Sequence, residues 1–106
     1  MIDEARVEKA VDYLSESAEP LAQARADRIA LEEGRKRLKA VIMSEHVKLP
    51  IAAQEREAYR DDRYGTHLHG LREAVYREQK LLALRDAAVS LIDAWRSMSA
   101  NQRGRI

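Results

Sequence analysis

The sequence predicts an all-α fold, a long antiparallel helical hairpin in which a short corner helix joins two long helices. Three observations lead to this prediction. Ala, Leu, Glu, Lys, Arg and Gln, which enter helices at the lowest cost in free energy, dominate the composition. Only two prolines and four glycines interrupt the 106 residues. The apolar residues recur at spacings of three and four, and a chain without Phe suits a thick sandwich or barrel badly.

The first long helix is expected from residue 3 to about residue 46, with a kink at Pro20. Its apolar stripe comprises Val7, Val11, Leu14, Ala18, Leu21, Leu31, Leu38 and Ile42. An interior proline costs a helix about 3 kcal/mol, yet the apolar phase passes through Pro20 without slipping. The pattern therefore favours one kinked helix. The alternative is a break that places Pro20 at the first position of a second helix.

The corner and the final helix follow from turn and cap residues. Pro50 can open a short helix over residues 50–60, and Asp61 or Asp62 is suited to cap a final helix over residues 62–100. Residues 1–100 are thus expected to form a single hairpin domain. Residues 101–106 would form a short basic tail.

The final helix carries two adjacent apolar seams, a stripe wider than one neighbouring helix can cover. The first seam holds Tyr64, Leu68, Leu71, Val75, Leu82, Val89 and Ile92. The second seam, extended by Ala74, gives the candidate oligomer seam: Leu81, Leu84, Ala88, Leu91, Trp95 and Met98. An uncovered apolar stripe predicts a homodimer in which two hairpins form a four-helix-like bundle. The alternative is a three-helix monomer in which the N-terminal segment folds back at Pro20 and covers the second seam.

Polar residues interrupt these seams and are expected to fix the register of the helices. Glu78 and Arg85 fall within the first seam of the final helix, and Arg28 and Arg35 fall between the leucines of the first helix. Polar residues in a coiled-coil seam select register and partner at some cost in stability. Trp95 follows the apolar phase and is expected to close the end of the bundle or the dimer seam.

The residue types argue against several kinds of chemistry. Cysteine is absent, and His67 and His69 point about 200° apart on a helix, so together they cannot grip one metal ion. No nucleophile motif, Gly-rich phosphate loop or pair of catalytic carboxylates is present. We therefore expect no enzymatic activity, cofactor, metal or small-molecule substrate. The acidic N-terminus and the lack of a long apolar run predict a cytoplasmic protein without a membrane partner.

Basic residues gather near the expected corner of the hairpin. The candidate nucleic-acid contacts are Arg35, Lys36, Arg37, Lys39, Lys48, Arg56, Arg60 and Arg63. Such clusters can neutralise phosphates, and Tyr59, Tyr64 and Tyr76 could stack on bases. Tyr64 shares the phase of the apolar seam and is expected in the core. Acidic residues are interleaved among the basic ones, so the alternative is an ordinary solvated helical face.

Three segments resemble small uncharacterised helical proteins of tailed phages and prophages of proteobacteria. These segments are "AAQEREAY" (Ala52 to Tyr59), "GLREAV" (Gly70 to Val75) and "AAVSLIDAWRSMSANQR" (Ala87 to Arg103). Such proteins are often encoded near early recombination genes. The resemblance implies a non-enzymatic accessory protein that acts in DNA recombination or replication by binding DNA or DNA-processing proteins. The alternatives are a protein-interaction module without nucleic-acid binding (an adaptor, a host-protein inhibitor or an assembly factor) and a virion assembly component.

Overall fold

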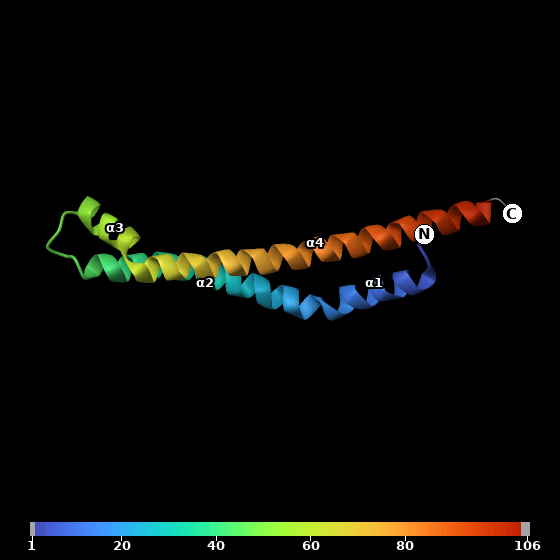
Figure 1. Cartoon of the computed structure of the whole chain (residues 1–106), viewed down its shortest axis with the longest axis horizontal. Helices are drawn as coiled ribbons and strands as arrows, with labels where there is room; N and C mark the ends of the chain where they lie inside the picture. Colours follow the sequence, from blue (N-terminus) through green and yellow to red (C-terminus); the bar gives the residue numbers. More distant parts are fainter. Residues whose placement is uncertain (1, 105–106) are drawn as a thin grey trace. The chain divides into compact units, whose positions relative to one another are not determined.

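A computed structural model describes residues 2–104, and this part of the chain contains four α-helices and no strand. The helices are α1 (Glu4–Glu16), α2 (Ala18–Ser44), α3 (Ile51–Arg60) and α4 (Asp62–Gly104) (Figure 1). The all-α prediction is therefore confirmed. No helix of the described range is long and apolar enough to cross a membrane.

The contacts within the chain fall into two compact units. The terminal unit comprises the chain up to Gln23 together with the chain from Gln79 onward, and the corner unit comprises Ala24–Glu78. Both α2 and α4 run through the two units.

The interruption of the first helical stretch lies at Ser17, and this corrects the expected continuous helix with a kink at Pro20. The Ser17 N–H donates to the Tyr13 carbonyl oxygen at 2.9 Å, and the Leu21 N–H donates to the Ser17 carbonyl oxygen at 3.0 Å. Pro20 is the third residue of α2, within the first turn, where backbone N–H groups have no partner inside the helix. The proline therefore costs α2 no hydrogen bond, which explains why the apolar phase continues through it.

In the terminal unit, α1 packs antiparallel against the second half of α4. Asp3 caps α1 by accepting the Arg6 N–H at 2.9 Å, and Val7 and Ala10 are buried on α1. Arg85 of α4 donates through Nη1 to the Leu14 carbonyl oxygen at 2.6 Å and to the Ser17 hydroxyl at 2.7 Å. The Leu14 carbonyl lies in the last turn of α1, where acceptors lack partners within the helix. Arg85 thus braces the chain at the junction between α1 and α2.

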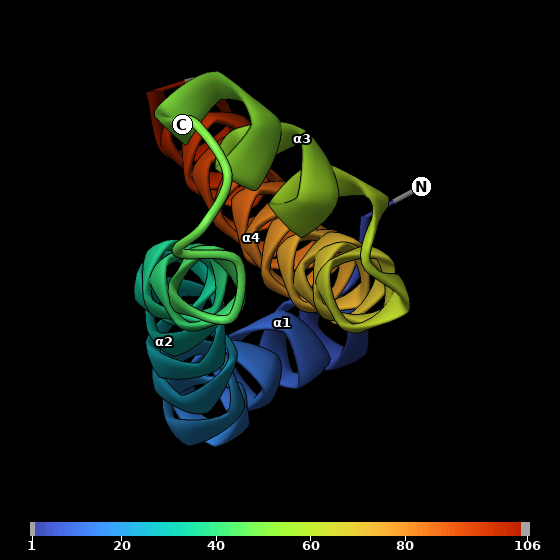
Figure 2. The ribbon, with the colours of Figure 1, turned by 90° about the vertical axis from the view of Figure 1, so that its left-hand side faces the viewer.

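In the corner unit, α3 lies over α2 and the start of α4, and the views in Figures 1 and 2 agree on this placement. Ile42, Ala58 and Tyr64 form the buried core, with Leu38 and Met43 packed against it. Ile42 has no exposed surface. Asp61 caps α4 by accepting the Arg63 N–H at 2.8 Å, which confirms the predicted cap and start of the final helix. The expected end at residue 100 is wrong, because α4 continues to Gly104. Residues 101–104 of the expected tail are therefore helical, and residues 105–106 lie outside the described residues.

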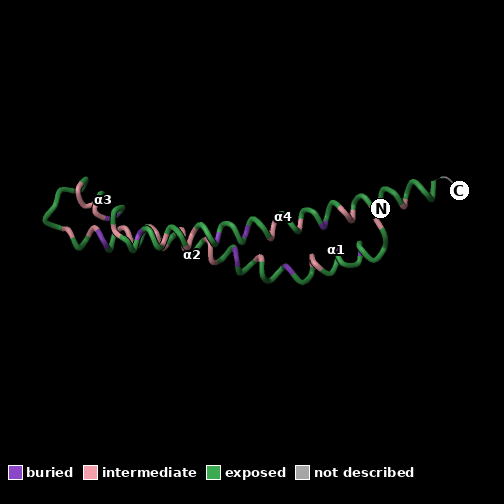
Figure 3. Tube along the Cα trace, viewed as in Figure 1, coloured by how far each residue is buried: buried purple, intermediate pink, exposed green. Residues whose placement is uncertain are grey.

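Buried residues occur singly along α2 and α4, with exposed residues between them (Figure 3). One of the buried residues in the corner unit is Glu78, whose carboxylate pairs with the Arg28 guanidinium and lies 3.9 Å from Arg25 Nε. Arg28 also donates to Glu32 at 3.1 Å. The hydrogen bond with Glu78, and then that with Glu32, raises the pKa of Arg28. Two polar residues of the predicted seams are therefore partners across the helix pair.

His67 also lies between α2 and α4 rather than in a metal site. Its Nε2 contacts the Leu31 carbonyl oxygen at 2.6 Å, and Gly34 leaves room for its ring. A methyl group added at Gly34 would lie 3.0 Å from His67 Cε1. His69 is exposed, and no group of three or more ligating side chains within residues 2–104 could hold a metal ion.

Candidate nucleic-acid interface

All eight basic residues selected from the sequence lie in the corner unit, but they differ in what they contact. Four form ion pairs: Lys36 with Glu33, Lys39 with Glu55, Arg60 with Glu57, and Arg63 with both Glu45 and Asp61. The other four, which form no ion pair with any residue that the structure describes, are Arg35, Arg37, Lys48 and Arg56. Half of the predicted contacts are therefore balanced by acidic neighbours.

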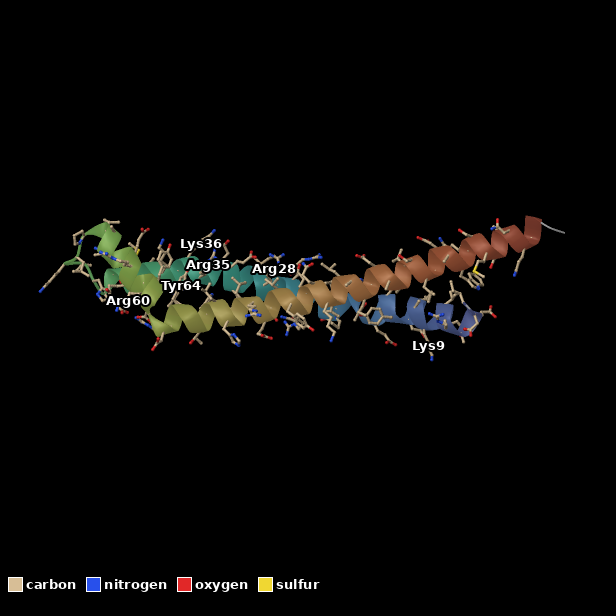
Figure 4. All side chains as sticks on the ribbon, turned by 45° about the horizontal axis from the view of Figure 1, so that its top comes forward. Lys9, Arg28, Arg35, Lys36, Arg60 and Tyr64 are labelled. Carbon is tan, nitrogen blue, oxygen red and sulfur yellow. The ribbon has the colours of Figure 1, made fainter. Side chains whose placement is uncertain are left out.

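Three of the eight surround a hollow of 260 Å³ in the corner unit. Its walls are Arg35, Lys36 and Lys39 from α2, Tyr59 from α3 and Tyr64 from the start of α4. Figure 4 shows Arg35 and Lys36 next to each other on α2, with Tyr64 nearby. No acidic side chain lines this hollow, so its walls present only cationic and aromatic groups.

Lys39 is held in place at one wall of the hollow. Its Nζ lies 3.1 Å from Glu55 Oε1 and 4.9 Å from the centroid of the Tyr59 ring, which is a cation–π distance. The Tyr59 side chain, and then Glu55, raises the pKa of Lys39, so this amine remains charged. Lys39 and Tyr59 were separate candidates in the sequence and Glu55 was not one, because their contact joins two helices across a turn and follows no spacing within one helix.

The two tyrosines of the hollow have different roles. Tyr64 is 9% exposed and belongs to the core, as its apolar phase predicted. Tyr59 is 54% exposed, and its ring meets Tyr64 edge to face with centroids 5.3 Å apart. Tyr64 therefore supports the ring of Tyr59, and Tyr59 offers an open aromatic surface at the hollow.

Arg63 ties the corner together and is not a free cation. Its guanidinium donates to Glu45 Oε1 at 2.6 Å and to Asp61 at 2.9 and 3.0 Å. These hydrogen bonds lower the pKa of Glu45, lower the pKa of Asp61 to about 2, and raise the pKa of Arg63. The side chain joins the loop after α2 to the cap of α4, which indicates a structural role.

The candidate oligomer seam is divided between the inside and the outside of the terminal unit. Ala88 is buried and Leu81, Leu91 and Trp95 are half-buried, whereas Leu84 and Met98 are exposed. Trp95 lines a second hollow, whose walls on α1 are Glu4, Val7, Glu8, Val11 and Asp12. Trp95 is thus placed beside α1 of its own chain.

The fold and the corner define the molecule as an all-helical protein with a cationic, tyrosine-lined hollow. Comparisons of the chain with protein-family models, curated proteins and solved structures find no match.

Proposed function

We propose that the protein is a non-enzymatic accessory protein, of the phage type that the sequence resembles, and that it binds DNA at the corner unit. The observation that carries the proposal is the hollow formed by Arg35, Lys36, Lys39, Tyr59 and Tyr64. Proteins that bind single strands combine cations that follow the phosphates with aromatic rings on which bases stack. This combination favours single-stranded DNA over duplex, since paired bases offer no free face to Tyr59.

Each group of the hollow has a defined part in this proposal. Arg35 and Lys36 would contact phosphates, because neither is held by a short ion pair: Arg35 forms none with the described residues, and the exposed Lys36 pair with Glu33 is 3.4 Å long. Tyr59 would stack on a base, an interaction worth about 1–3 kcal/mol. Lys39 and Tyr64 would hold the Tyr59 ring in position.

The proposal is tested by fluorescence anisotropy with a labelled oligothymidine and a labelled duplex over a series of salt concentrations. Arg35→Gln/Lys36→Gln should weaken single-strand binding and make the dependence of log K on log salt less steep by about 1.4, or about 0.7 for each lost phosphate contact. The matched control is Arg72→Gln/Arg96→Gln, which removes the same charge from exposed positions of α4. If both double variants weaken single-strand binding equally, the effect comes from net charge alone, and the hollow is not the binding site.

The stacking role has its own pair of variants. Tyr59→Ala should weaken single-strand binding, whereas Tyr76→Ala should not, although Tyr76 is 64% exposed on α4 of the same unit. Absence of binding by the parent protein at the lowest salt concentration would overturn the DNA proposal as a whole.

A second candidate function, a protein-interaction module, is favoured by the turn between α2 and α3. Val47 is 72% exposed, Leu49 40% and Ile51 68%, so three large apolar side chains meet water at this turn. Exposed apolar groups of this kind mark contacts with other proteins. This function predicts that a partner protein co-purifies with the parent protein and does not co-purify with the Val47→Ser/Ile51→Ser variant. It also predicts that the parent protein shows no salt-dependent binding of DNA.

A further inference from the structure

We infer that a single DNA strand crosses the corner unit from α2 to α3 over the ring of Tyr59, and that Arg56 forms a second phosphate subsite beyond that ring. This path rests on the proposed function, in which Arg35 and Lys36 hold a phosphate and Tyr59 stacks on a base. It narrows the ligand to a nucleotide inside a strand, because only such a nucleotide has a phosphate on each side of its base.

Arg56 lies beside Tyr59 on α3, on the side away from α2. It is three residues before Tyr59, a spacing at which two side chains are neighbours on a helix surface. At about 100° per residue, Arg56 and Glu55 lie on opposite sides of Tyr59 around the helix. Glu55 marks the side that faces α2, because it binds Lys39 of α2 at 3.1 Å. Tyr59 therefore lies between the cations of α2 and the guanidinium of Arg56.

Arg56 has no acidic neighbour on its own face of α3. The side chain is exposed and forms no ion pair with any residue that the structure describes. The positions three and four residues away from it hold Ala53, Tyr59, Ala52 and Arg60. Arg56 thus presents a positive charge to solvent that no carboxylate on this face offsets.

The two carboxylates next to Arg56 in the sequence are bound by other cations. Glu55 accepts from Lys39 at 3.1 Å, and Glu57 pairs with Arg60 at 3.5 Å. Arg60, which Figure 4 labels on α3, is four residues after Arg56, and like charges at this spacing repel each other. A phosphate bound beside Arg56 would reduce that repulsion. The outer side of α3 therefore favours an anion.

The order of groups across the corner matches the order of groups along a strand. Arg35 and Lys36 of α2 come first, the exposed ring of Tyr59 follows, and Arg56 lies beyond it. A strand presents a phosphate, a base and a second phosphate in the same sequence. Cations that follow the backbone and an aromatic ring that stacks on a base are the two elements of single-strand binding.

Arg37 shows that an unpaired cation of this unit need not belong to the path. It is exposed and, like Arg56, forms no ion pair with the described residues. It is two residues before Lys39, so it points about 200° away from that side chain around α2. Arg37 does not line the hollow either. It is therefore the matched control for Arg56.

Fluorescence anisotropy with labelled oligothymidine tests the subsite. Arg56→Gln should lower the affinity about eightfold at about 50 mM salt and make the dependence of log K on log salt less steep by about 0.7, the value for one phosphate contact of a single strand. Arg37→Gln should bind like the parent protein. No weakening by Arg56→Gln, or equal weakening by both variants, would overturn the subsite. The helicity of both variants should equal that of the parent in circular dichroism, because both side chains are exposed.

The crossing of the strand is tested with trithymidylate, in which only the middle base lies between two phosphates. Replacing either phosphate by an uncharged methylphosphonate should weaken binding to the parent protein. In Arg56→Gln one of these replacements should have no effect, and in Arg35→Gln/Lys36→Gln the other should have none. If both variants become insensitive to the same replacement, all three cations contact one phosphate and the strand does not cross α3.

Failure of the path can be distinguished from failure of the proposed function. A parent protein that binds no oligothymidine at the lowest salt concentration would overturn the proposed function and the path together. A parent protein that binds, and that is weakened by Arg35→Gln/Lys36→Gln but not by Arg56→Gln, would overturn the path alone.

Discussion

Replacing Arg85 by Met should uncouple α1 from α2, because a single guanidinium braces the interruption at Ser17. The variant keeps an unbranched apolar stem but loses the hydrogen bonds to the Leu14 carbonyl, at 2.6 Å, and to the Ser17 hydroxyl, at 2.7 Å. Hydrogen bonds from charged donors contribute about 1.5–3 kcal/mol each when they are buried. Arg85 is half-buried, so the two together should contribute about 3 kcal/mol.

Urea unfolding followed by far-ultraviolet circular dichroism measures this loss, which corresponds to a fall in Tm of about 12 °C or more. Hydrogen exchange should show the local effect as faster exchange of the Leu21 amide, which bonds across the interruption to Ser17. The matched control is Arg96→Met, an exposed arginine of the same helix whose replacement should cost less than about 0.5 kcal/mol.

A double-mutant cycle separates the two hydrogen bonds. Ser17→Ala removes one acceptor and should cost about 1 kcal/mol, and it should cost almost nothing in the Arg85→Met background. The bracing role of Arg85 is refuted if Arg85→Met destabilises the protein no more than Arg96→Met does. It is also refuted if the cost of Ser17→Ala is the same in both backgrounds.

Three further predictions follow from single features of the fold. The Tyr13 hydroxyl is buried and has no hydrogen-bond partner among the described residues, so Tyr13→Phe should leave stability unchanged or raise it by about 1 kcal/mol in thermal unfolding. Gly34→Ala should displace the His67 ring, and the imidazole resonances in an NMR spectrum should move, because the new methyl group would lie 3.0 Å from Cε1. Arg63 holds the pKa of Asp61 at about 2, below its ordinary 3.8. The stabilisation from ionised Asp61 should thus be complete above pH 3.8 and disappear as the pH falls through about 2, as measured by urea unfolding along a pH series.

Each of these predictions has a contrary outcome. A clear loss of stability in Tyr13→Phe would mean that the hydroxyl has a partner. Gly70→Ala is the control for Gly34, because nothing lies within 4 Å of the added methyl group, and it should stabilise α4 by about 1 kcal/mol. Equal stabilisation by both alanine variants would contradict the close approach of His67. Asp61→Asn should abolish this pH-dependent contribution to the free energy of unfolding. If the variant still loses the same stability at low pH, another carboxylate is responsible for the loss.

The elements of this fold could be predicted from the sequence because their causes are local. Asp61 caps α4 through a side chain two residues from its donor, and the apolar spacing alone indicates the helices. A break near Pro20 was the alternative to a kinked helix, but its position at Ser17 was not predicted. Pro20 has no N–H to donate to the Glu16 carbonyl, which favours a break just before it, and Arg85, which lies 68 residues farther along the chain, bonds to Ser17 at that break. A helical pattern identifies Pro20 as a local disturbance, but it cannot show that a distant guanidinium supports the chain three residues earlier.

The candidate site was only partly predictable for a related reason. Arg63 and Arg35 look alike in the sequence, yet Arg63 is bound by two carboxylates and Arg35 by none of the described residues. Which cations remain free depends on the fold of the corner and on the acidic side chains that it brings close. Similarly, periodicity places Leu84 and Ala88 in one seam, and only the packing of α1 decides that Ala88 is inside and Leu84 outside.

Glu78 gives the helix pair of the corner unit a fixed alignment. The buried Ala24 and Ile42 of α2 and the buried Ala74 of α4 are small or aliphatic, and such side chains fit one another almost equally well after a shift of one heptad, about 10 Å. That shift would bring Leu71 to the level of Arg28 and leave a guanidinium facing an aliphatic side chain. Replacing both Arg28 and Glu78 by Leu would therefore keep the two helices together while removing one of the contacts that fix their alignment, and the contact of His67 with the Leu31 carbonyl would remain.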